Sequence, residues 1–229
     1  MVTEPADSSA PGLGRWLTRR LREILRQEGW RGVRFRALAL LGWRSCGLYV
    51  RGLDASATAV TAAVPAEIRE LGAADARDYL AFRPEAPTRF LRRLHAGHAC
   101  FAARHDGRIV AATWVAVGRG RLEYLGRDVL LAPDEIYLFD SFTASELRGR
   151  RLFPAIFAVI AATYRARGYR HAVTCIAVHN RSSRRSRERS GFRRIGTVRR
   201  LPRKPIRLAG FAACDGGRQD PPPGLQPQP

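Results

Sequence analysis

The stretch from residue 135 to residue 168 constrains the fold of this chain most strongly. It reads EIYLFDSFT, then ASELRGRR, then LFPAIFAVIAATYRARG. The first part is typical of a strand, the second of a basic loop, and the third of a helix, because its apolar residues recur at helical spacing and glycine closes it. Pro154 has no N–H and fits only the first turn of a helix, so we expect this helix to begin between residues 150 and 153.

The basic loop before this helix is a candidate anion site. The first N–H groups of a helix have no partner within it, and the helix dipole is positive at that end. Arg148, Gly149, Arg150 and Arg151 stand directly before Leu152. The sequence therefore predicts that a phosphate group binds at this turn. The alternative is an ordinary strand-to-helix turn with solvated arginines.

The surrounding pattern indicates one α/β domain. Asp106-Gly107 between two β-like runs predicts a hairpin over residues 99–117. Further expected strands cover residues 67–71, 121–131, 171–178 and 192–201, and expected helices cover residues 73–82 and 87–96.

The expected domain boundaries follow from composition and periodicity. Residues 1–12 and 213–229 are polar or rich in Pro, Gly and Gln, and we expect them to be disordered. Residues 13–55 are expected to form an appendage, which begins with a basic amphipathic helix and is closed by a short strand at 46–54. Residues 56–63 are expected to be a linker, and the α/β domain is expected to cover residues 64–212.

Residues 180–192 contain five arginines and four serines. Such composition is common in disordered nucleic-acid contacts. We expect a short helix here instead, because Ser182 or Ser183 can cap its start and Gly191 can end it in a left-handed conformation. Phe192 would then open the following strand.

The two basic segments together resemble the GNAT superfamily of N-acetyltransferases. Residues 146–151 are similar to its acyl-CoA-binding loop, Arg/Gln-x-x-Gly-x-Gly/Ala, through Gly149. Glu146 replaces the first Arg/Gln of that pattern, and Arg151 stands at its last small residue. The family's spacing after its fifth strand is matched by Asn180, Ser183, Gly191 and Phe192.

The resemblance covers roughly residues 64–201. It implies a mixed, mostly antiparallel central sheet flanked by helices, and direct transfer of an acetyl group from acetyl-CoA to an amine. In the family, the amides of this loop bind the pyrophosphate of coenzyme A. Backbone amides near the end of the preceding strand bind the pantetheine arm and polarise the thioester carbonyl, and the resemblance places these amides at residues 142–143 of this sequence. The cofactor-binding residues that it implies are Phe142, Thr143, Arg148, Gly149, Arg150, Arg151, Leu152, Asn180, Ser183 and Arg187. Arg187 stands where the family frequently has a tyrosine that protonates the departing thiolate; an arginine can stabilise that thiolate instead.

The leading candidate for the base that takes the proton of the amine is Asp140, because a carboxylate within the apolar run YLFDSF needs a reason to be there. A salt bridge to an arginine is the alternative. Glu135 and Glu146 are the other carboxylates in this region. Tyr137 is a candidate for holding the substrate or relaying a proton, or else a core residue. Alternation along the strand predicts Tyr137, Phe139 and Ser141 on one face, and Leu138, Asp140 and Phe142 on the other.

The formal net charge is +20, which attracts anions of any kind, so it indicates the sign of the partner but not its identity. The rival hypothesis keeps the fold but makes it an arginine-rich binding module for RNA, the ribosome or an anionic membrane surface. The acceptor amine and the oligomeric state are left open.

Four scattered cysteines, without a Cys-x-x-Cys pair or a secretory leader, indicate reduced thiols and a cytoplasmic protein. The longest apolar run, at 152–162, is shorter than the roughly 20 residues of a membrane span. His95, His98 and Cys100 have a spacing that hints at a metal, but no complementary ligand cluster accompanies them, so we expect no metal site.

Overall fold

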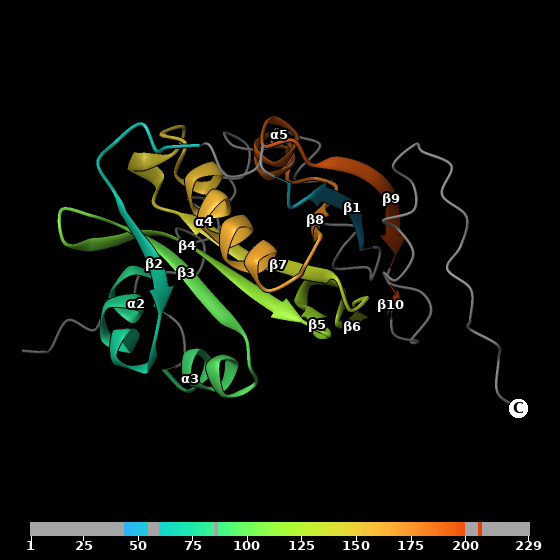
Figure 1. The fold of residues 1–229 in the computed structure, drawn as a ribbon, viewed down its shortest axis with the longest axis horizontal. Coiled ribbons are helices and arrows are strands. Elements are labelled where there is room, and N and C mark those ends of the chain that lie inside the picture. The colour runs from blue at the N-terminus through green and yellow to red at the C-terminus, as the bar shows by residue number, and fades with distance from the viewer. Residues whose placement is uncertain (1–43, 55–59, 85–86, 200–205, 208–229) are drawn as a thin grey trace, which may run out of the picture.

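A computed structural model describes residues 44–54, 60–84, 87–199 and 206–207 (Figure 1). The strands are β1 (Ser45–Gly52), β2 (Glu67–Leu71), β3 (Ala99–His105), β4 (Arg108–Val117), β5 (Arg119–Leu122), β6 (Arg127–Leu130), β7 (Glu135–Thr143), β8 (His171–Ala177), β9 (Arg193–Arg199) and β10 (Ile206–Arg207). The helices are α2 (Ala76–Phe82), α3 (Pro87–His95), α4 (Leu152–Ala166) and α5 (Arg181–Arg189). The basic helix expected from residue 13 and both segments expected to be disordered lie outside the described residues.

The described strands form a seven-stranded sheet in the order β2-β3-β4-β7-β8-β1-β9 and a small sheet of β10, β6 and β5. In the large sheet, β7 and β8 are parallel and the other neighbours are antiparallel. Helix α4 covers one face, and α2 and α3 cover the other (Figure 1). The predicted mixed, mostly antiparallel α/β fold is confirmed.

Several local predictions are also confirmed. Strands β3 and β4 meet at Asp106 and Gly107, whose φ angles of 49° and 72° are those that a two-residue hairpin turn requires. Helix α4 begins at Leu152, so Pro154 lies in its first turn. The arginine-serine segment forms α5.

The prediction of a single strand over residues 121–131 was wrong. Residues 119–130 form the hairpin of β5 and β6, joined by a 3-10 turn over Glu123–Leu125 and by Gly126 in a left-handed conformation with φ 64°. A single strand would need extended backbone at these positions, which the turn interrupts.

The strand at residues 46–54 was expected to close an N-terminal appendage, and this prediction was also wrong. Strand β1 lies inside the main sheet, between β8 and β9. Its residues 46–50 are all buried, because both of its faces are covered and both of its edges are paired. The predicted boundary at residue 55 therefore divides the domain.

A bulge interrupts β7. Trp114 of β4 pairs with Phe139 and Ala112 pairs with Phe142, so Thr113 alone lies opposite two residues of β7. One of these two residues, Asp140, has a φ of 46°. The predicted alternation of side chains is therefore wrong beyond Phe139.

Strands β7 and β8 separate just before this bulge. Their pairing ends at Leu138 and Thr174, although β7 continues to Thr143 and β8 to Ala177. The Thr174 hydroxyl donates to the Leu138 carbonyl at 2.8 Å, at the last point of contact. The sheet is thus opened at the position where the chain turns from β7 toward α4.

Candidate functional site

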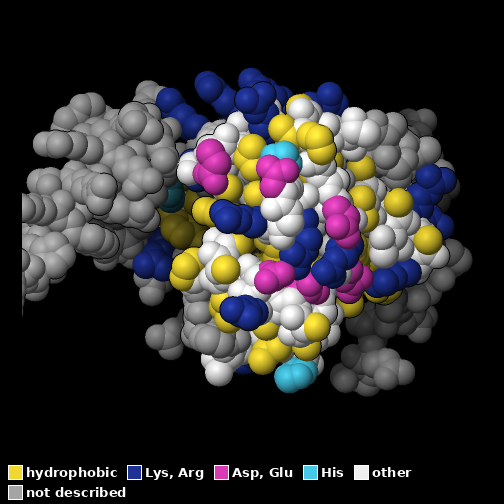
Figure 2. Space-filling view, turned by 90° about the vertical axis from the view of Figure 1, so that its left-hand side faces the viewer, with side chains coloured by type: hydrophobic (Ala, Val, Ile, Leu, Met, Phe, Trp, Pro, Cys, Tyr) yellow, Lys and Arg dark blue, Asp and Glu magenta, His cyan; other side chains and the backbone are white. Residues whose placement is uncertain are grey.

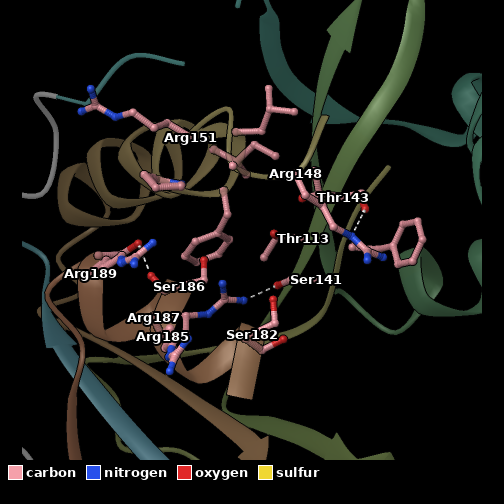
Figure 3. A pocket seen from close by; sticks show the side chains of 18 of the residues that line it. Thr113, Ser141, Thr143, Arg148, Arg151, Ser182, Arg185, Ser186, Arg187 and Arg189 are labelled. Atoms are coloured by element: carbon pink, nitrogen blue, oxygen red, sulfur yellow. Dashed lines mark hydrogen bonds between the residues drawn. The ribbon is translucent and has the colours of Figure 1, made fainter. Parts of the chain in front are cut away.

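A cavity of about 1310 Å³ lies beside this opening, between the end of β7, the start of α4 and the whole length of α5 (Figure 3). Nine of the ten predicted cofactor-binding residues line it: Phe142, Thr143, Arg148, Gly149, Arg151, Leu152, Asn180, Ser183 and Arg187. Arg150 does not. Its amide donates to the Leu147 carbonyl at 3.3 Å, and its side chain is exposed outside the cavity lining.

The start of α4 presents free amide groups to this cavity. The amides of Gly149, Leu152 and Phe153 have no backbone acceptor among the described residues. Gly149 has a φ of 82° and Arg151 a φ of 58°, so both adopt the left-handed conformation that favours glycine. Figure 3 shows the Arg151 side chain extending away from Arg187 and Ser141. This turn has the donors that the predicted anion site requires.

Helix α5 has no apolar residue, and polar contacts hold it in place. Its N-cap is Asn180, whose Oδ1 accepts from the Ser183 amide at 3.0 Å; the prediction that Ser182 or Ser183 caps the helix was wrong. Arg184 Nε donates to the Tyr49 hydroxyl on β1 at 3.1 Å. At the other end, Gly191 ends the helix with a φ of 78°, as predicted. Strand β1 therefore supports one wall of the cavity.

Arg187 is a buried cation in this wall. It is only 6% exposed, and its Nη2 donates to Ser141 Oγ at 2.7 Å (Figure 3). Its guanidinium carbon lies 3.2 Å from the centre of the Phe153 ring. No carboxylate of the described part of the chain pairs with it, and its Nε has no partner. Burial lowers the pKa of Arg187 to about 9, so the side chain is still protonated at neutral pH.

Ser141 and Thr113 are among the polar residues of the cavity that were not predicted from the sequence. Ser141 accepts the hydrogen bond from Arg187, and Thr113 on β4 is 1% exposed with an unpaired hydroxyl. Both lie at the bulge of β7. The alternation rule assigned Ser141 to the face of Tyr137, and no sequence signal for the bulge was recognised. Thr113 could have been found only from the register of β4 against β7.

Asp140 points to the other side of the bulge, toward α2 and α3. Its Oδ2 accepts from Arg93 Nη1 at 2.7 Å, and its Oδ1 lies 2.5 Å from Arg83 Nη2. Arg93 is itself buried against the rings of Trp114 and Phe139. Asp140 does not line the cavity, and both of its oxygens are engaged. The structure thus gives Asp140 the salt bridges of the alternative interpretation.

Tyr137 lies in the core and does not line the cavity. Its ring stacks on Phe139 at 5.7 Å and lies so close to Gly120 that a Cβ there would be 2.7 Å from it. Burial raises the pKa of Tyr137 well above its usual value, which makes it a poor proton relay. The core interpretation of this tyrosine therefore fits the structure.

The other two carboxylates are no better placed. Glu135 is fully buried at the far end of β7 from the cavity, where its Oε2 accepts from the Ala132 amide at 3.0 Å. Burial raises the pKa of Glu135. Glu146 is exposed and accepts from the Ser145 hydroxyl. Neither side chain lines the cavity.

The positive charge is unevenly compensated over the surface. At the end of the molecule that carries β2, α2 and the β3–β4 hairpin, acidic and basic side chains lie side by side (Figure 2). There Asp75 pairs with both Arg69 and Arg104, at 2.5 and 3.0 Å. The cavity lining, by contrast, contains seven arginines and no carboxylate among the described residues: Arg51, Arg148, Arg151, Arg181, Arg185, Arg187 and Arg189.

No group of three or more His, Cys, Asp or Glu side chains in the described ranges is arranged to hold a metal ion. His98, from the predicted spacing, packs its ring against Phe139 at 5.4 Å, and Cys100 is buried. No helix within the described part of the chain is long and apolar enough to cross a membrane.

No protein-family model and no curated protein matches the sequence. Solved structures do match the fold. A GCN5-related glucosamine N-acetyltransferase region of a fungal multi-domain GH3 β-N-acetylglucosaminidase is 15% identical, with a TM-score of 0.51 over 74% of this chain and 22% of that one. A GNAT superfamily phosphinothricin acetyltransferase from Sinorhizobium meliloti, in complex with AcCoA, is 18% identical, with a TM-score of 0.46 over 57% and 76% of the two chains. An N-acetyltransferase from Staphylococcus aureus is 17% identical, with a TM-score of 0.45 over 58% and 86%.

The first of these structures matches 74% of the chain with a TM-score above 0.5. Together with the strand order and the opening between β7 and β8, it shows that the protein has the fold of the GNAT superfamily.

Proposed function

We propose that the protein is an acyl-CoA-dependent N-acyltransferase that transfers an acetyl group from acetyl-CoA to an amine. One observation carries the proposal: the cavity runs from the free amides at the start of α4 to the end of β7, where β7 and β8 part. A nucleotide diphosphate fits the first end, because amides, a positive helix end and arginines converge there. An extended thioester arm fits the second end.

The proposed residue roles follow the cavity from one end to the other. The amides of Gly149, Leu152 and Phe153, with Arg148, hold the diphosphate. Phe142 and Thr143 on the last part of β7 hold the pantetheine arm, since a strand edge without a partner offers its backbone groups to a ligand. Asn180 and Ser183 fix the start of α5.

In the proposed reaction, the amine nitrogen attacks the thioester carbon, a C–N bond forms, and the C–S bond breaks to release the thiolate of coenzyme A. Arg187 lies beside Ser141, the residue before the proposed thioester position, and it stabilises the negative charge of the thiolate. A thiol of pKa about 8.5 needs only about 2 kcal/mol to leave ionised at pH 7. A cation at this point makes a proton donor unnecessary.

The amine has to lose a proton before it attacks. For a primary amine of pKa about 10.4, this costs about 4.6 kcal/mol at pH 7. The described residues that line the cavity include no carboxylate, and Asp140 is held by two arginines on the other side of the sheet. We therefore propose that water, rather than Asp140, takes the proton.

A second candidate function is supported by the same arginines. A cavity lined by seven arginines and, among the described residues, by no carboxylate also fits an RNA or another polyanion, which the fold would then bind without catalysis. The two functions differ in what they require of the arginines. A cofactor pocket depends on those that line it, whereas a polyanion surface depends on all exposed arginines nearby to a similar extent.

The adjacent residues Arg148 and Arg150 separate the two functions. Isothermal titration of the full chain with acetyl-CoA is expected to show binding, which Arg148→Ala weakens about tenfold by removing a charged contact. Arg150→Ala is the matched control, because Arg150 is exposed but lies outside the cavity lining. Absence of binding at millimolar acetyl-CoA would refute the enzyme. Equal losses of RNA affinity in both variants, without acetyl-CoA binding, would favour the binding module.

A further inference from the structure

The interior of the cavity has two buried hydrogen-bond donors without a partner among the described residues. Arg187 Nε and the Thr113 hydroxyl are both buried without a partner, and neither is accounted for by the diphosphate site or the thioester carbonyl. Buried polar groups are nearly always paired, so each of these requires an explanation. Their common feature is that both can donate to an oxygen.

The two groups belong to one place in the fold. Thr113 lies opposite the bulge of β7, which includes Ser141. Arg187 reaches from α5 to Ser141, with its Nη2 at 2.7 Å from the hydroxyl (Figure 3). Thr113, Ser141 and Arg187 therefore form a cluster, which we call the inner cluster, at the deep end of the cavity.

The inner cluster carries one full positive charge that nothing in the described chain neutralises. Water and dissolved ions screen the charge of an exposed arginine. Arg187 is only 6% exposed, so its charge is screened much less. Arg93, the second buried arginine of the described ranges, is paired with Asp140. Burying a cation without a counter-ion has a large desolvation free energy. A ligand that places an anion beside this cation offsets that free energy through their attraction. An acetyl group brings none before the thiolate forms.

We infer that the inner cluster binds a carboxylate at the end of a short acyl chain, so that the preferred acyl donor is a dicarboxylic acyl-CoA such as succinyl-CoA. The inference rests on the proposed function, because it takes the thioester to lie along Phe142 and Thr143. Ser141 directly precedes these residues and accepts from Arg187, so the proposed position of the acyl chain lies beside Arg187. The guanidinium offers a planar pair of donors that matches a carboxylate.

The test compares two donors of equal chain length, succinyl-CoA and butyryl-CoA, which differ by the terminal carboxylate. Dissociation constants are measured on the full chain by isothermal titration, with coenzyme A as the reference. We expect succinyl-CoA to bind at least tenfold more tightly than butyryl-CoA. We expect Arg187→Gln to abolish this preference, because it weakens the binding of succinyl-CoA much more than that of butyryl-CoA. Arg165→Gln, which removes an exposed arginine at the far end of α4, is expected to keep the preference.

Three outcomes would contradict the expected preference for succinyl-CoA, and they show whether the carboxylate site or the proposed function has failed. If both thioesters bind the wild-type chain equally well, the carboxylate site is refuted and the proposed function stands. If Arg187→Gln weakens coenzyme A and both thioesters by the same factor, Arg187 recognises the shared part of the ligand, and the inference fails. If no thioester binds, the proposed function itself fails. The first outcome is read from the wild-type chain alone, so it does not depend on the folding of a variant.

Discussion

Replacing Arg187 with methionine is expected to stabilise the protein at pH 7 in the absence of ligand. Methionine has a comparable length and fills the space beside the Phe153 ring without a charge. The guanidinium is 6% exposed and has no carboxylate partner among the described residues. Removing it therefore removes a desolvated charge without breaking an ion pair.

The magnitude follows from the pKa of Arg187, which burial lowers to about 9. Because each unit of pKa corresponds to about 1.4 kcal/mol, the charged form is disfavoured in the fold by about 4 to 5 kcal/mol. The hydrogen bond to Ser141 and the contact with Phe153 offset about 2 to 3 kcal/mol of this. We expect Arg187→Met to raise the free energy of unfolding by about 2 kcal/mol.

Arg93→Met is the control, because Arg93 is equally buried but pairs with Asp140 at 2.7 Å. This change should lower the free energy of unfolding by about 3 kcal/mol, since it breaks a buried pair. Both variants are measured by urea denaturation at 25 °C in low-salt buffer, followed by circular dichroism. A loss of stability in Arg187→Met, with an unchanged dependence on urea, would refute the reasoning.

The pH dependence gives a second check on the same variant. A cation whose pKa is lowered by folding carries its full penalty below its folded pKa, and the penalty shrinks as the pH rises from that value toward the unfolded pKa. The advantage of Arg187→Met over the wild type should therefore be complete at pH 7 and smaller at pH 10. An advantage that is constant over this range would mean that the charge is not its cause.

Two further predictions concern carboxylates. Asp140→Asn is expected to lower the free energy of unfolding by about 2 kcal/mol, because it weakens two ion pairs, and to change kcat less than tenfold; a loss above a hundredfold with a flattened pH profile would make Asp140 the base after all. The Arg69 guanidinium lowers the pKa of Asp75 to about 2, so the stability that this carboxylate contributes is present above about pH 4 and is lost as the pH falls toward 2. The difference in unfolding free energy between Asp75→Asn and the wild type should shrink over that interval in urea titrations, and a difference that stays constant would contradict the assignment.

The parts of the fold that depend on local chemistry were predictable from the sequence. The Asp106-Gly107 hairpin and the start of α4 at Pro154 follow from backbone restrictions that act over a few residues. Helix α5 follows from its two ends, although its cap is Asn180 rather than a serine. Nine of the ten cofactor-binding residues that the resemblance to the GNAT superfamily implied line one cavity.

The remaining features depend on contacts between distant parts of the chain. The bulge in β7 exists only against β4, and it turned Asp140 away from the cavity and Ser141 into it. The place of β1 between β8 and β9 could not be read from its sequence, since a buried strand has the same apolar pattern wherever it is inserted. The ion pairs of Asp140 were foreseen as an alternative, but their partners come from α2 and α3, across the sheet.

The position of β1 also has a consequence for how the chain reaches its native state. Leu48 pairs with Cys175 on one side and with Gly196 on the other, and these partners are made 127 and 148 positions later. During synthesis, this early strand has no place to dock until almost all of the domain has emerged, and closing so long a loop makes folding slow. Until then the backbone N–H and C=O groups at the edge of β8 are unpaired and can pair with non-native strands. We therefore expect assembly of this half of the sheet to limit the folding rate.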